Sequence, residues 1–134
     1  MGHAAPAADI SPRSQIVLAD ADDALRRALT FALELEGYDV ATCRDGESLV
    51  ALDLPSQAAC LVIEQRLQRM SGLDALEALR ARGVTLPAIL LTSYADPQTR
   101  RRSRQARAWL VEKPLLAFAK RRFGIRHIAT VTVP

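Results

Sequence analysis

Four polar side chains that could do chemistry stand at the ends of short apolar stretches of this sequence. They are two carboxylates, a hydroxyl and an ammonium group, from Asp20, Glu64, Thr92 and Lys113. Carboxylate oxygens bind metal ions, and an ammonium group balances the charge of carboxylates or phosphoryl groups. A single polar residue at a strand end is usually just solvated. Four at successive strand ends indicate one site, provided that the strands lie together in a sheet.

Hydrophobic periodicity predicts the elements that would position these residues. We expect strands at 15–20, 38–43, 60–64, 88–92 and 109–113, and helices at about 23–36, 46–53, 73–82 and 97–107. Asp22 or Asp23 should cap the first helix and Asp45 the second. Continuous apolar strands that alternate with amphipathic helices favour an α/β fold with a parallel sheet covered on both faces. In such sheets, function gathers at the carboxyl ends of the strands, where the four polar residues lie.

Length and composition fit one soluble domain. The chain has 134 residues, of which 49% are hydrophobic and 25% are charged. No apolar run approaches the roughly 18 residues that a membrane span needs, and the N-terminus lacks the apolar core of a secretory signal. We interpret Cys43 and Cys60 as buried thiols and not as a disulfide, so we expect a cytoplasmic protein. We interpret residues 1–14 as a flexible tail, 15–123 as the domain and 124–134 as an atypical C-terminal tail. Two cysteines and two scattered histidines make a structural zinc site improbable.

The charges are unevenly distributed along the chain. Residues 1–99 hold 8 Lys+Arg and 14 Asp+Glu, a net charge of −6, whereas residues 100–134 hold 10 Lys+Arg and one acid, a net charge of +9. The basic part includes an arginine cluster at Arg100, Arg101, Arg102, Arg104 and Arg107. This cluster is either a solvated helix face or a surface that meets an acidic partner or nucleic acid.

Five stretches resemble the receiver domain of response regulators. They are IVLADADDALRRAL (16–29), ELEGYDVATCRDGESL (34–49), LVIEQRLQRMSGLDALEALRARG (61–83), LPAILLTSYAD (86–96) and VEKP (111–114). The resemblance implies a flavodoxin-like (βα)5 doubly wound sandwich with a five-stranded parallel sheet, and a role in two-component signalling. Its usual chemistry moves a phosphoryl group from a histidine kinase to an aspartate with the help of Mg²⁺.

The resemblance carries the family's site onto this sequence residue by residue. The paired acids fall on Asp20 and Ala21, and the phosphoacceptor aspartate falls on Glu64. The hydroxyl that contacts the phosphate falls on Thr92 and the lysine on Lys113. The family's aromatic switch position falls on Leu110 when counted back from the lysine, or on Trp109 when aromatic is matched to aromatic.

Two of these positions depart from the family pattern. Ala21 offers no oxygen to Mg²⁺, which prefers octahedral oxygen coordination, so we expect no metal or other cofactor. Glu64 is one methylene longer than aspartate and advances into the place of the incoming phosphorus, while phosphoryl transfer depends on positioning. Glu64 therefore either imitates part of the phosphorylated state, with Lys113 and Thr92 as partners, or only forms a fixed pair with Lys113.

The second half of the family's signalling surface also departs from the pattern. Residues 97–107 have almost no apolar side chain, so we expect this helix to be irregular, mobile or held by a partner. The fifth helix is expected to be short or atypical, at about 115–123, followed by a β-branched stretch at 128–133. An uncovered core on this side would favour a homodimer through the fourth helix, fifth strand and C-terminal face.

We therefore predict a single-domain, degenerate receiver that acts as an interaction module and is not an enzyme. Its partner would be a histidine kinase or another signalling protein. The alternative is a phosphorylatable receiver in a phosphorelay. Nucleic-acid binding through 100–107 and 120–126 is less favoured because no reading helix of known type is visible, and flavin binding lacks a phosphate-cradling loop.

Overall fold

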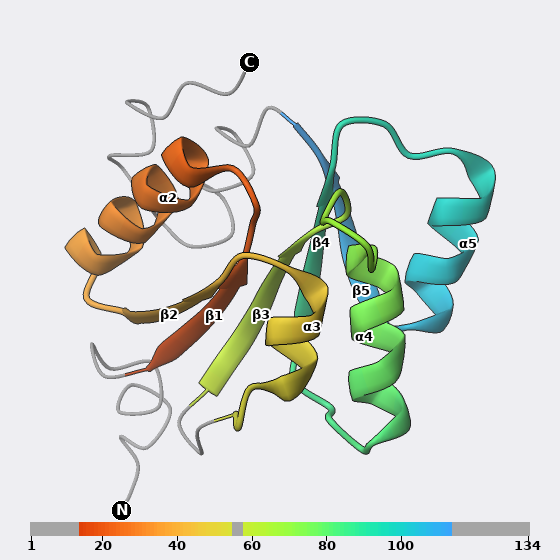
Figure 1. Ribbon diagram of the computed structural model, residues 1–134, viewed down its shortest axis with the longest axis horizontal. Helices are drawn as coiled ribbons and strands as arrows, with labels where there is room; N and C mark the ends of the chain where they lie inside the picture. Colours follow the sequence, from red (N-terminus) through yellow and green to blue (C-terminus); the bar gives the residue numbers. More distant parts are fainter. Residues whose placement is uncertain (1–13, 55–57, 114–134) are drawn as a thin grey trace, which may run out of the picture.

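A five-stranded parallel sheet forms the centre of the molecule. The computed structural model describes residues 14–54 and 58–113. The strands are β1 (Gln15–Ala19), β2 (Asp39–Cys43), β3 (Ala58–Glu64), β4 (Ala88–Thr92) and β5 (Ala108–Glu112). They are ordered β2-β1-β3-β4-β5, and every neighbouring pair is parallel (Figure 1). The predicted α/β sandwich is confirmed, and each strand lies within two residues of its expected bounds.

Helices connect the strands, and a polar side chain caps each of them. The helices are α2 (Asp23–Leu35), α3 (Gly46–Ala51), α4 (Gly72–Ala81) and α5 (Pro97–Gln105). Asp22, Asp45, Ser71 and Asp96 each accept a hydrogen bond from a backbone N–H of the first turn that follows. These caps satisfy amides that have no partner within the helix, which explains why the helices begin where they do.

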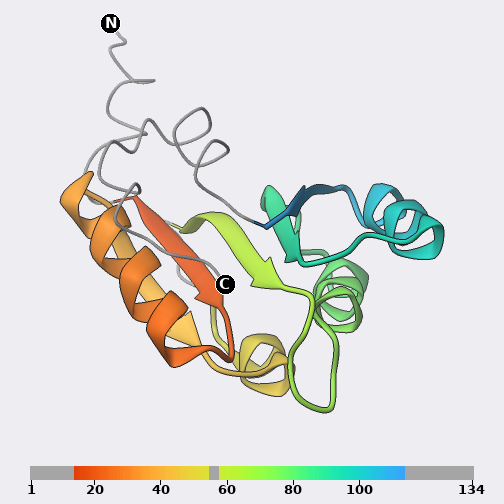
Figure 2. The same ribbon diagram turned by 90° about the horizontal axis from the view of Figure 1, so that it is seen from above.

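The sheet divides the core into two layers. On one face, Ile16, Leu18, Val62, Ile89 and Leu91 of the strands pack with the buried side of α2. On the other face, residues at alternate positions of the same strands pack with α3, α4 and the end of α5. The three central strands are therefore buried on both sides, as their continuous apolar sequences predict. Figure 2 shows α5 at the β5 edge, far from α2.

The expectation of an irregular helix at 97–107 is wrong. Residues 97–105 form a regular α-helix, which begins with Pro97 after the Asp96 cap, where its fixed φ suits the first turn. Ser103 and Ala106 are buried against the rest of the molecule. Arg102 adds ion pairs to α4. Polar contacts and capping thus replace the apolar stripe whose absence suggested disorder.

Some predictions fall on residues that the structure does not describe. The short fifth helix at 115–123, the strand-like stretch at 128–133, the C-terminal tail at 124–134 and residues 1–13 of the N-terminal tail lie outside the described residues. Ser14, the last residue of the predicted N-terminal tail, is buried. The domain limits of 15 and 123 stay predictions. Across the described ranges, no helix is long and apolar enough to cross a membrane.

Candidate functional site at the carboxyl edge of the sheet

The four polar residues found in the sequence lie at one edge of the sheet. Asp20 follows β1, Glu64 and Thr92 end β3 and β4, and Lys113 follows β5. Because these strands are parallel neighbours, their carboxyl ends meet at the same edge. Asp20, Glu64 and Thr92 are all buried, with exposed fractions of 1%, 4% and 5%.

Glu64 and Lys113 form an ion pair that links β3 to β5 across this edge. Lys113 Nζ lies 2.5 Å from Glu64 Oε1, and the side chains are 17% and 5% exposed. The contact has the distance of an ion pair, although its angles are not those of a hydrogen bond. The second oxygen, Oε2, accepts a hydrogen bond from the Arg66 backbone N–H at 3.2 Å. Both carboxylate oxygens of Glu64 are therefore engaged within the chain.

Asp20 is the acid with the less complete set of partners. Its Oδ1 accepts a hydrogen bond from the Asp22 backbone N–H at 2.9 Å, whereas its buried Oδ2 has no hydrogen-bond partner among the described residues. Burial is the main cause that raises the pKa of Asp20 above its ordinary value, and the nearby charge of Glu64 adds to it. The hydrogen bond from Asp22 and the charge of Lys113 lower the pKa by less.

The Thr92 hydroxyl is engaged with its own loop. Thr92 Oγ1 donates to the Tyr94 carbonyl at 3.0 Å and accepts from the Tyr94 N–H at 3.3 Å. Neither hydrogen bond joins Thr92 to Glu64, so the contact expected for an imitation of the phosphorylated state is not made through this hydroxyl.

Glu112 holds the loop that follows Thr92, a role that the sequence analysis missed. Its Oε2 accepts a hydrogen bond from the Ala95 N–H at 3.0 Å. Arg100 lies 3.8 Å from the same oxygen and donates through Nε to the Ala95 carbonyl at 3.2 Å. Glu112 is the single acid among residues 100–134, a signal that could have drawn attention to it.

The two residues that follow Asp20 add no free carboxylate to the site. Ala21 packs as a partly buried residue against the core layer of α3 and α4. Asp22 caps α2 through a hydrogen bond from the Leu25 N–H to its Oδ1 at 3.0 Å, as the sequence predicted. Within 14–54 and 58–113, no group of three or more His, Cys, Asp or Glu residues is arranged to hold a metal ion.

The two candidates for the aromatic switch position lie on opposite faces of β5. Leu110 is paired in register with Leu90 and packs against the core on the α3 and α4 side. Trp109 is paired with Ile89 and has an exposed fraction of 50%. The choice between them stays open, but Trp109 offers a fluorescent reporter four residues before Lys113.

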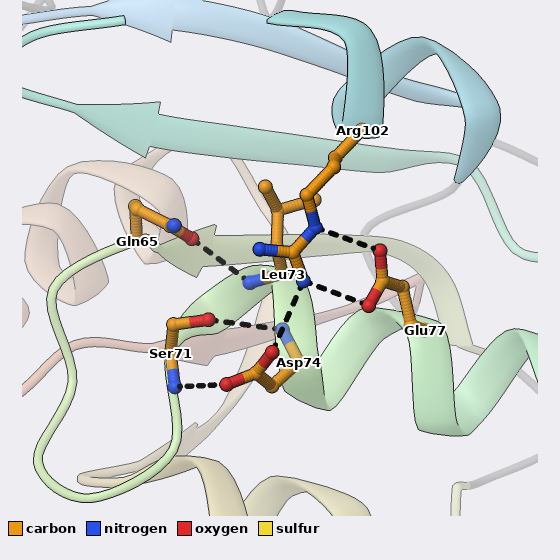
Figure 3. A network of polar contacts seen from close by, with 6 residues as sticks. All are labelled: Gln65, Ser71, Leu73, Asp74, Glu77 and Arg102. Atoms are coloured by element: carbon orange, nitrogen blue, oxygen red, sulfur yellow. Dashed lines mark hydrogen bonds and ion pairs between the residues drawn. The ribbon is translucent and has the colours of Figure 1, made fainter. Parts of the chain in front are cut away.

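The arginine cluster does not act as one group. Arg102 reaches from α5 to α4, where it contacts Glu77 at 2.8 Å and Asp74 at 3.0 Å (Figure 3). Asp74 also forms a capping box with Ser71, while the Gln65 side chain accepts from the Leu73 N–H at 2.9 Å. The hydrogen bond from Arg102 is the main cause that lowers the pKa of Asp74, followed by the one from Ser71. Arg102 thereby ties α5 to the start of α4, beside the loop that follows Glu64.

The fold and this edge together define a class of protein: an α/β domain whose candidate site lies at the carboxyl ends of parallel strands. The profile of the response regulator receiver domain matches residues 16–117. The chain therefore belongs to the response regulator receiver domain family. Members of this family are signalling modules that interact with histidine kinases and other signalling proteins.

Individual relatives agree with this assignment. The transcriptional regulatory protein TdiR of Thauera aromatica is 33% identical over 85 residues, which are 63% of this chain and 37% of that protein. A receiver protein structure from Pseudoalteromonas atlantica has 30% identity and a TM-score of 0.69, covering 75% of this chain and 84% of that one. The non-phosphorylated HemR receiver domain of Leptospira biflexa has 26% identity and a TM-score of 0.76, covering 91% and 98%. The chain spans 37%, 36% and 19% of three of its curated relatives.

Proposed function

We propose that this receiver domain signals through protein contacts and does not undergo the usual Mg²⁺-dependent phosphorylation on an aspartate. The observation that carries the proposal is the buried ion pair between Glu64 and Lys113 at the acceptor position. A phosphoacceptor must present a free carboxylate oxygen in line with the leaving group of the donor. Here Lys113 occupies one oxygen of Glu64 and the Arg66 N–H occupies the other.

The described residues offer Mg²⁺ a poorer donor set than the paired acids of the family pattern. An octahedral magnesium site needs one or two carboxylates with free oxygens, completed by water and phosphate. Asp20 offers one unpartnered oxygen, Oδ2, but Ala21 offers none and the Glu64 charge is balanced by Lys113. Asp22, the next acid along the chain, is committed to the cap of α2.

The fixed pair explains the site better than imitation of a phosphorylated state. A phosphoryl group presents up to two negative charges and three strong acceptor oxygens, whereas Glu64 presents a single charge that Lys113 already matches. Imitation would also call on the Thr92 hydroxyl, which donates to the Tyr94 carbonyl instead. The burial of Glu64 is compatible with both interpretations, so the argument depends on the orientation of Thr92.

The alternative, a phosphorylatable receiver, also has an observation in its favour. Asp20 Oδ2 is buried and unpartnered at the edge where the family carries out its chemistry. A small phosphoryl donor tests both proposals directly. Incubation with acetyl phosphate and Mg²⁺, followed by intact mass spectrometry, should give no phosphorylated protein. The matched control is the Ala21→Asp/Glu64→Asp variant, which restores both carboxylates of the family pattern and should gain phosphorylation.

A phosphorylated wild-type protein would contradict the proposal if Glu64→Gln or Asp20→Asn abolished the adduct. An acid-stable mass increase would mark phosphorylation elsewhere, because an acyl phosphate is labile. A wild-type chain that stays unmodified while the double variant is modified would support the proposal. If neither protein is modified, Ala21 and Glu64 do not by themselves explain the absence of phosphorylation, and the proposal that these two residues prevent it is wrong.

A further inference from the structure

Three arginines form an exposed basic surface on the outer side of α5. Arg101 and Arg104 are one turn apart on the helix, and Arg107 follows directly after its C-cap, Ala106. All three are exposed. None of their side chains makes an ion pair or a hydrogen bond with the described part of the chain. We call Arg101, Arg104 and Arg107 the α5 arginine face.

The other arginines near α5 differ from these three because they have internal partners. Arg102 pairs with Asp74 and Glu77, and Arg100 contacts Glu112 and the Ala95 carbonyl. The Arg80 side chain donates to four backbone carbonyls, including those of Ala106 and Arg107. Figure 3 shows Arg102 reaching from α5 to Asp74 and Glu77 of α4. Arg80 of α4 contacts the end of α5, whereas Arg101, Arg104 and Arg107 are exposed.

Two features of the α5 arginine face cost stability within the isolated chain. Like charges one turn apart on a helix repel each other by a few tenths of a kcal/mol, which applies to Arg101 and Arg104. Arg107 has a φ of 58°, a left-handed conformation that follows the helix end, where glycine is the favoured residue. An arginine at a position whose backbone conformation favours glycine is a reason to look for a role of the arginine side chain.

We propose that the α5 arginine face binds a short acidic segment of a partner protein. Carboxylates would satisfy three guanidinium groups that have no partner in the described part of the chain, and would relieve their repulsion. Arginine is also enriched in protein interfaces, where its planar group binds carboxylates through two hydrogen bonds. The inference goes beyond the proposed function, because the surface exists whatever the chemistry at Glu64.

A protein segment fits this surface better than nucleic acid. A nine-residue helix extends only about 13 Å at 1.5 Å per residue, a length that accommodates a few side chains. Residues 14–99 hold 7 Arg and 13 Asp+Glu. A long polyanion would extend beyond the α5 arginine face onto this acidic remainder and be repelled, whereas a short acidic segment would not.

Fluorescence anisotropy with a labelled hexaglutamate peptide tests the inference on the full chain. We expect saturable binding at low ionic strength and none with a hexaglutamine peptide. The Arg101→Gln/Arg104→Gln variant should weaken binding about tenfold, because each exposed charge contributes up to about 1 kcal/mol. The matched control is Arg27→Gln/Arg66→Gln. It removes the same charge from two other exposed arginines, whose side chains have no partner within 14–54 and 58–113, and it should change the affinity less than twofold.

Three results would overturn the inference. They are absence of saturable peptide binding, equal weakening by both double variants, and tighter binding of short duplex DNA than of the peptide through the same arginines. The first result excludes the ligand, the second shows a response to net charge alone, and the third assigns the surface to nucleic acid. None of them bears on the phosphorylation test, so the two proposals fail independently.

Discussion

At the level of single residues, the described part of the site edge holds two buried acids, Asp20 and Glu64, and one ammonium group, that of Lys113. Lys113 lies against Glu64, and Asp20 is left with one hydrogen bond and an unpartnered oxygen. An incompletely satisfied buried carboxylate costs free energy in its ionised form. Ionisation of Asp20 is therefore less favourable in the folded chain than in the unfolded chain, and its raised pKa makes stability depend on pH.

The Asp20→Asn variant should be more stable than the wild-type protein at neutral pH, by about 1 kcal/mol, the order expected for relief of a poorly paired buried polar group. The pKa of Asp20 is raised in the folded state, mainly by burial. Protonation thus contributes stability that is complete below the unfolded-state pKa and is lost as pH rises through the folded-state pKa. Asparagine cannot ionise, so the variant keeps this stability. Urea unfolding at a series of pH values measures the difference.

The difference between the two proteins should disappear in acid, where the wild-type Asp20 is protonated too. The exposed residue Asp53 provides the control, since Asp53→Asn should leave the free energy of unfolding unchanged at every pH. A variant that is less stable than wild type at neutral pH would show that the ionised Asp20 is better solvated or better paired than its buried Oδ2 indicates.

The sequence identified Asp20, Glu64 and Lys113 as neighbours because strand ends in a parallel sheet meet at one edge whatever the details of packing. It did not predict which way the Thr92 hydroxyl turns. That orientation depends on the backbone of Tyr94, and on a loop that Glu112 holds from β5. Such contacts between segments far apart in the sequence have no periodic signal.

At the level of elements, α5 is held by polar contacts more than by apolar packing. Ser103 and Ala106 are its buried residues. Arg102 of α5 forms ion pairs with α4, and Arg80 of α4 donates a hydrogen bond to the carbonyl of Ala106 at the end of α5. An arginine that donates to several carbonyls also satisfies the free C=O groups near the end of a helix. The expectation of an irregular helix failed because it counted apolar residues and could not see these partners.

The ends of α5 and α4 provide a matched pair of substitutions, at Arg107 and Gly83. Arg107→Gly should stabilise the protein by about 0.5–1 kcal/mol, because Arg107 has a φ of 58° and glycine adopts this conformation without strain. Gly83→Ala should destabilise it by a similar amount. Gly83 has a φ of 92° and no atom within 4 Å of an added Cβ, so only the backbone conformation is affected. Thermal or urea unfolding measures both changes.

We expect Arg107→Gly to stabilise the protein and also to weaken binding of the hexaglutamate peptide. This result would mean that Arg107 contributes to peptide binding and costs the protein stability. A destabilised Arg107→Gly variant would show instead that the arginine side chain contributes to folding. The Gly83→Ala variant should leave peptide binding unchanged.

Most boundaries of the strands and helices could be predicted from the sequence, because caps and periodicity act locally. Asp45 and Ser71 mark helix starts through their own side chains, and the β4 strand was predicted with its observed limits, 88–92. The parallel order of the strands came from the resemblance to a family and from the alternation of strands with helices. Residues 114–134 stay a matter of prediction.

At the level of the whole molecule, the family supplies the fold and the signalling context, and we propose that two positions of the site, Ala21 and Glu64, change how this chain uses them. Its curated relatives include transcriptional regulatory proteins, of which the chain matches only a part. A histidine kinase as partner and a homodimer through the α5 and β5 side stay proposals. The main claim is that Glu64, paired with Lys113, and Ala21 leave this receiver without a site for a metal-bound phosphoryl group.

Titration with beryllofluoride and Mg²⁺, followed by Trp109 fluorescence, tests this claim most directly, because the complex takes the shape of a phosphoryl group and requires a metal and a free acceptor oxygen. The account predicts no saturable change for the wild-type protein, and a saturable change for Ala21→Asp/Glu64→Asp. A saturable, Mg²⁺-dependent response of the wild-type protein that is lost in Asp20→Asn would contradict it.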